Sequence, residues 1–157
     1  MSEISYSNVP PIMAAIKSGD IEAIRSLLRE GYSPNEPQCY QVNIGAWPRD
    51  EKSSPLELAV LENRMDMVRL LIESGADLTH NPEELLYGSL RSPDLSLFSF
   101  LIDSGVRIPA EQENIYRLFL FLENWHDPNV LPILDKLGMD VKQYGGEALR
   151  SMASQGN

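Results

Sequence analysis

Few residues in this chain could act as nucleophiles or acid–base groups. The single cysteine, Cys39, and the two histidines, His80 and His126, could in principle supply a thiolate and a base. No local motif of a cysteine-dependent enzyme surrounds them, so we keep such an enzyme only as a remote alternative. One cysteine excludes an internal disulfide, and with only two histidines it argues against a structural zinc site.

Other catalytic motifs are missing from the sequence. It contains no Gly-x-Ser-x-Gly elbow, no phosphate-binding loop and no His-Glu-x-x-His pair, and its Gly-Gly at 145–146 has no following lysine. The adjacent carboxylates Asp50/Glu51 and Glu83/Glu84 are better explained as loop or first-turn charges than as catalytic dyads. We expect a protein that is not an enzyme and that needs no cofactor or metal ion.

Charge and length limit the classes of partner. The chain has 157 residues, enough for one domain, with 13 Lys and Arg against 23 Asp and Glu, a formal charge of −10. This charge repels nucleic acid and favours a basic protein partner. No apolar run reaches the roughly 20 residues that cross a bilayer, and the N-terminus lacks a signal-peptide pattern. We therefore expect a soluble, cytoplasmic chain that does not bind membranes and is a monomer when free.

A unit of two short helices recurs along the chain. The stretches that begin at Pro10, Ser54, Glu83 and Arg117 each show an apolar helix pattern, a polar break, a second apolar helix and a glycine turn. In the second helices the triplets Ile24/Leu27/Leu28, Val68/Leu71/Ile72 and Phe98/Leu101/Ile102 give each copy one apolar stripe. Two helices of this length cannot bury such a stripe alone, so the copies are expected to stack into one core.

The second copy resembles the ankyrin repeat. SPLELAVLENR, from Ser54, and LLIESGADL, from Leu70, match a family pattern that opens with Thr-Pro-Leu-His-x-Ala, breaks at Gly-His and closes with Leu-Leu…Gly-Ala-Asp. The sequence departs from that pattern at Glu57 and at Asn63-Arg64. The resemblance implies an all-α solenoid of about four helix-turn-helix repeats with short hairpin loops. The expected segments of this single domain, 1–157, are repeats at 6–35, 50–79, 80–109 and 113–141, an inserted loop at 36–53 and a C-terminal capping helix at 145–154.

The inserted loop lies where ankyrin repeats project a hairpin. The turn glycines Gly31 and Gly75 are 44 residues apart, about a dozen more than the usual repeat. The insert has two possible roles. Either it folds back on the core, with Trp47 filling a gap between helices, or it is a binding loop with Tyr40 and Trp47 as anchors.

The resemblance also implies a set of partner-binding residues. The alignment places Lys17, Leu61, Glu62, Arg91, Asn124 and Trp125 on the concave face, and Asp50, Glu51, Glu83 and Tyr116 on its hairpin side. Together with Tyr40 and Trp47 they combine aromatic and acidic side chains, as in a protein-binding patch. Two functions remain open. The chain either masks one partner as a stoichiometric inhibitor, antitoxin or immunity protein, or serves as a scaffold or regulatory subunit of a larger complex.

Overall fold

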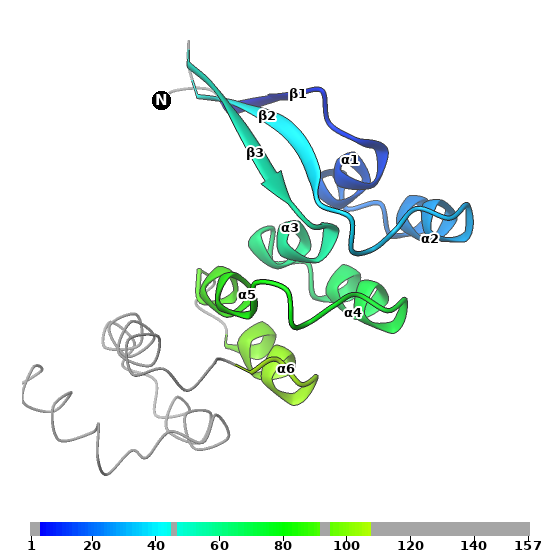
Figure 1. The fold of residues 1–157 in the computed structure, drawn as a ribbon, viewed down its shortest axis with the longest axis vertical. Coiled ribbons are helices and arrows are strands. Elements are labelled where there is room, and N and C mark those ends of the chain that lie inside the picture. Colours follow the sequence, from blue (N-terminus) through cyan, green and yellow to red (C-terminus); the bar gives the residue numbers. More distant parts are fainter. Residues whose placement is uncertain (1–3, 45–46, 92–94, 108–157) are drawn as a thin grey trace, which may run out of the picture. The chain divides into compact units, whose positions relative to one another are not determined.

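The computed structural model describes residues 4–44, 47–91 and 95–107 (Figure 1). The chain divides into two compact units, residues 1–80 and 81–157. The first contains β1 (Ile4–Ser7), α1 (Pro11–Ser18), α2 (Ile21–Arg29), β2 (Gln38–Ile44), β3 (Trp47–Ser53), α3 (Pro55–Leu61) and α4 (Met65–Glu73). The second contains α5 (Pro82–Ser89) and α6 (Ser96–Asp103). The predicted fourth repeat and capping helix lie outside the described residues.

The helices of the first unit form two stacked pairs. Helix α1 contacts α2, and α3 contacts α4. The two pairs stack so that the first helices contact each other, α1 against α3, and the second helices contact each other, α2 against α4, as Figure 1 shows. In the second unit α5 contacts α6 in the same way. The described helices therefore form the helix-turn-helix repeats that the sequence predicts.

A capping box begins the second pair. The Ser54 hydroxyl accepts a hydrogen bond from the Glu57 backbone N–H at 3.2 Å, and the Glu57 carboxylate accepts one from the Ser54 N–H at 2.7 Å. Pro55 fills the first helical position, where no N–H is needed. Glu57, which stands where the ankyrin pattern has histidine, therefore satisfies a backbone donor at the helix start.

The break between α3 and α4 consists of Asn63 and Arg64, where the ankyrin pattern has Gly-His. Asn63 has a φ of +53°, a left-handed conformation that asparagine tolerates better than most residues. Arg64 extends toward Gly19, the corresponding turn of the first pair. A Cβ at Gly19, whose φ is +80°, would lie 3.3 Å from the Arg64 Nη1 atom. The glycine therefore permits both the turn and the close approach of the guanidinium.

The core follows the predicted stripes in part. Ile24, Val68 and Leu71 are buried in the first unit, whereas Leu27, Leu28 and Ile72 are only partly buried. In the second unit the whole predicted triplet is buried, together with residues from α5: Phe98, Leu101, Ile102, Leu85 and Leu86.

Asn35 connects the first two pairs at their turns. Its side-chain Nδ2 donates to the Gly75 carbonyl at 3.0 Å, and its Oδ1 accepts from the Asp77 backbone N–H at 2.7 Å. Both groups lie just beyond α4. One side chain thus satisfies a donor and an acceptor of a turn that is 40 residues away in the sequence.

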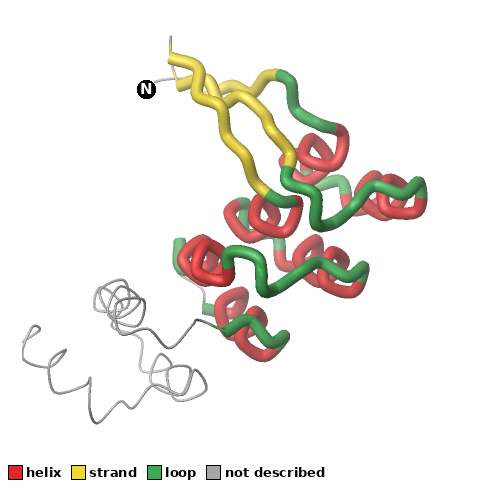
Figure 2. The backbone as a smooth tube through the Cα atoms, viewed as in Figure 1, coloured by secondary structure: helices red, strands yellow, loops and turns green. Residues whose placement is uncertain are grey.

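The inserted segment differs from the predicted loop. It forms the hairpin β2–β3, and β1 pairs with β2 to complete an antiparallel sheet in the order β1-β2-β3 (Figure 2). The register sets Tyr6 opposite Val42, and Tyr40 opposite Glu51. The expected all-α architecture with short hairpin loops is therefore incomplete, because the insert and the N-terminus together build a three-stranded sheet.

Candidate functional site

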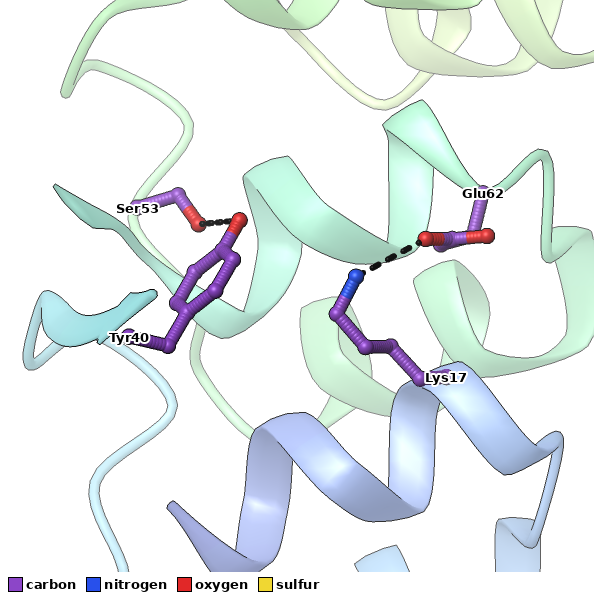
Figure 3. A network of polar contacts seen from close by, with 4 residues as sticks. All are labelled: Lys17, Tyr40, Ser53 and Glu62. Carbon is purple, nitrogen blue, oxygen red and sulfur yellow. Dashed lines mark hydrogen bonds and ion pairs between the residues drawn. The ribbon is translucent and has the colours of Figure 1, made fainter. Parts of the chain in front are cut away.

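The side chain of Lys17, near the C-terminal end of α1, lies at the centre of a contact network. Its Nζ is 3.2 Å from the Glu62 Oε1 atom just after α3, as Figure 3 shows. The same ammonium lies 3.5 Å from the centroid of the Tyr6 ring and 5.3 Å from that of Tyr40. We call Tyr6, Lys17, Tyr40 and Glu62 the Lys17 cluster. It connects two strands of the sheet to the first helix of each pair.

Physical chemistry explains why this arrangement is stable. The Lys17 side chain is mostly buried, so its ammonium needs the carboxylate and the ring faces to replace water. A cation over an aromatic ring contributes about 1 to 2 kcal/mol when partly desolvated. Lys17 also lies in the last turn of α1, where the helix dipole favours a positive charge.

Tyr40 is a buried component of this network. Its exposed fraction is 6%, and its hydroxyl lies 3.4 Å from the Ser53 Oγ, within hydrogen-bonding distance (Figure 3). Ser53, which ends β3, is also buried. Tyr40 therefore fixes the base of the hairpin against the start of α3 and offers little area to a partner.

The two faces of the sheet differ in chemistry. On one face Ser7 Oγ donates to Gln41 Oε1 at 3.2 Å, and Gln41 Nε2 donates to Asp50 Oδ1 at 3.0 Å. These three residues form a polar ladder across all three strands. Tyr6 and Tyr40 lie on the opposite face, which we call the inner face. Because side chains alternate along a strand, Glu51 shares that inner face while Asp50 does not.

Two exposed apolar residues lie beside the Lys17 cluster or within it. Tyr6 is 44% exposed although one face of its ring contacts Lys17. Leu61, at the end of α3 and next to Glu62, is 40% exposed. Trp47, the other predicted anchor of the insert, pairs with Ile44 at the far end of the hairpin. The described surface thus combines an aromatic, an aliphatic and an acidic side chain.

Groups suited to catalysis do not converge among the described residues. Cys39 is exposed on β2, and His80 is exposed beyond α4. Hydrogen bonds from the Thr79 side chain and backbone lower the pKa of Asp77, and nearby His80 lowers it further. Within the described part of the chain, no group of three or more His, Cys, Asp or Glu side chains is arranged to hold a metal ion.

Comparison with known proteins agrees with the architecture. A family model for ankyrin repeats, built on three copies of the repeat, matches residues 3–82. The chain belongs to the ankyrin-repeat family. Members of this family are generally non-enzymatic modules for protein–protein interaction, so an interaction with another protein is the function that the repeats indicate.

Two ankyrin-repeat proteins are similar to this chain over much of its length. One is the "Ankyrin repeat protein nuc-2" of Neurospora crassa, 27% identical over 114 residues that cover 66% of this chain and 10% of that protein. The other is a "Putative ankyrin repeat protein" of Rickettsia felis, 24% identical over 132 residues that cover 84% and 43% of the two chains. The chain therefore spans less than half the length of either relative.

The remaining predicted residues of this ankyrin-repeat chain belong to the second unit or are outside the described residues. In the second unit Glu83 is half-buried in the first turn of α5, and Arg91 is exposed after that helix. Tyr116, Asn124 and Trp125 lie outside the described residues. Among the described helices, none is long and apolar enough to span a membrane.

Sequence reasoning missed Tyr6. The signal was present, because Ile4-Ser5-Tyr6-Ser7 alternates apolar and polar residues as an exposed strand does. Four residues are too few to predict a strand without knowing its partner, and that partner, β2, lies more than 30 residues away. The ankyrin pattern gave no help either, because the part of it that this chain matches begins at the start of the first helix of a repeat.

Proposed function

We propose that this chain binds another protein through the concave side of its repeats and the inner face of its sheet, and that binding masks the partner. The observation that carries the proposal is the group of exposed side chains around the Lys17 cluster. Tyr6, Leu61 and Glu62 come from a strand and a helix end that the cluster holds together. Aromatic and aliphatic contacts with a polar rim are typical of protein interfaces.

Charge supports a basic protein as the partner. The net charge of −10 repels phosphate backbones and attracts cationic surfaces. Glu51 and Glu62 provide carboxylates on the proposed surface, and both are at least partly exposed. A soluble, cytoplasmic location and a monomeric free state are parts of the same proposal.

The experiment begins with affinity purification of the chain and its partner from the native source. Light scattering of the purified complex then gives its stoichiometry, and the activity of the partner is measured with and without the chain. An inhibitor, antitoxin or immunity protein forms an equimolar complex in which the partner is inactive. A complex in which the partner keeps its activity would contradict masking.

The alternative is a scaffold or regulatory subunit. Its supporting observation is that the chain corresponds to only part of two longer ankyrin-repeat proteins. A scaffold holds two different partners at once, so a ternary complex at saturation would favour it over the inhibitor.

The predicted tryptophan anchors allow a separate test of the surface. Replacing both Trp47 and Trp125 with Ala removes large contact areas, and we expect at least a tenfold loss of affinity, mainly as faster dissociation. The circular dichroism spectrum checks that the fold is intact. If the double variant is folded and binds normally, Trp47 and Trp125 are not the anchors.

A further inference from the structure

We propose that Tyr6, Leu61 and Glu62 form a docking surface for an extended partner segment that carries an arginine close to an aliphatic side chain. We call these three residues the Tyr6 surface. The inference rests on the proposed function, because it names the chemistry that the partner brings to that site. It adds a residue of the N-terminal strand β1, which precedes the first helix, to the binding surface.

Tyr6 is a fixed aromatic residue with a free side. The Lys17 ammonium lies 3.5 Å from the ring centroid and so restrains the ring, yet 44% of the residue stays exposed. A ring that is already held in place loses little conformational entropy when a partner covers it. Lys17 is thus a positioning residue, and Tyr6 is the residue that a partner can touch.

Glu62 determines the sign of the partner's charge. Its Oε1 contacts Lys17 Nζ at 3.2 Å, while the side chain keeps an exposed fraction of 34%. The Lys17 side chain is only 15% exposed and its ammonium already has a carboxylate and two rings as neighbours. An acidic side chain of a partner would therefore meet the carboxylate of Glu62 before it met the ammonium of Lys17. A cation is the complementary group.

Arginine fits this surface better than lysine. A guanidinium is planar, so it can pair with a carboxylate through its N–H edge while its face stacks on an aromatic ring. Glu62 and Tyr6 offer these two partners, and both are linked to the same Lys17 ammonium. A lysine would supply a point charge without the stacking area. The overall charge of −10 also favours the approach of a cation.

Leu61 supplies the apolar part of the surface. It precedes Glu62 at the end of α3 and is 40% exposed, so an aliphatic side chain of the partner can cover it. In an extended segment, residues two positions apart point to the same side. An arginine and an aliphatic residue with that spacing can therefore reach Glu62 and Leu61 together.

The test is selection from a displayed library of random peptides against the full chain. Enriched peptides are expected to carry an arginine two residues from Leu, Ile or Val. Synthetic copies are then titrated against the chain by fluorescence. Changing the arginine to lysine is expected to weaken binding about threefold or more, and changing it to glutamate about tenfold or more.

Variants of the chain test whether the peptide binds at the Tyr6 surface. Tyr6→Ala and Glu62→Gln should each lower peptide affinity about tenfold or more, and Tyr6→Phe should retain most of it because the ring remains. Tyr32→Ala is the matched control: this tyrosine is 41% exposed, close to Tyr6, but lies beyond α2 and outside the cluster. The affinity of the Tyr32→Ala variant for the peptide should stay within about twofold of that of the unmodified chain.

Three results would overturn the inference: enrichment of peptides without arginine, unchanged binding by a folded Tyr6→Ala variant, or no enrichment at all. None of them removes the proposed function if the chain still copurifies with a native partner in a stoichiometric complex. Failure of that copurification would count against the proposed function itself.

Discussion

Single residues explain why this chain departs from the ankyrin pattern without losing the repeat. Glu57 satisfies the N–H of Ser54 at the start of α3, and Asn63 adopts the left-handed turn that glycine usually provides. Such replacements could not be predicted from the pattern alone, because each depends on the local hydrogen bond or backbone angle that the residue satisfies.

Removing the cap at the start of α3 should destabilise the first unit. We expect Ser54→Ala to lower the free energy of unfolding by about 1 kcal/mol, because the Glu57 N–H loses its acceptor in a buried position. Urea unfolding followed by circular dichroism measures the change. Ser26→Ala, on the exposed side of α2, is the control and should change stability far less. Equal losses in both variants would contradict the role of the cap.

Lys17, Tyr40 and Glu62 were each predicted as binding residues but not as a network, and Tyr6 was not predicted. The resemblance to ankyrin repeats implies that Lys17 and Glu62 lie on one face. It does not show that they contact each other across 45 residues or that Tyr6 joins them, since this depends on the fold of the insert. In the proposed surface, Lys17 holds Tyr6 and Glu62 in place, since its own side chain is only 15% exposed.

At the scale of elements, the helices were predictable and the sheet was not. The helices repeat one apolar pattern that can be compared between copies. The insert occurs once, and although Tyr40, Val42 and Ile44 alternate with polar residues in β2, the charged run in β3 gives no such signal. In addition, β2 pairs with β1, which precedes α1 and α2 in the sequence. A local sequence pattern contains no information on such a non-local contact.

The burial of a side chain in the second helix of a pair should set the cost of truncating it. Leu71→Ala in α4 should lower the free energy of unfolding by about 2 to 5 kcal/mol, because the side chain is fully buried. Leu27→Ala in α2 should cost about half of that or less, since its side chain is only partly buried. Urea unfolding of both variants provides the test. The slope of each transition is compared with that of the unmodified chain, to check that the surface exposed on unfolding is unchanged. Equal costs would mean that Leu27 is buried as fully as Leu71.

At the scale of the whole molecule, charge should govern how fast the chain captures its partner. If the partner is basic, raising the salt concentration should slow association more than it speeds dissociation, because steering acts at long range and is screened. Stopped-flow mixing of the chain with the copurified partner measures both rates. Salt-independent association would contradict a basic partner, whatever the affinity.

The central claim is that the inner face of the sheet and the ends of α1 and α3 bind a protein, and amide hydrogen exchange tests it most directly. The exchange of the full chain is compared with and without the copurified partner, peptide by peptide. The account predicts that the partner slows exchange in β1, in the β2–β3 hairpin and at the C-terminal ends of α1 and α3, where Lys17 and Glu62 lie. Protection confined to α2 and α4, with the sheet unchanged, would contradict it.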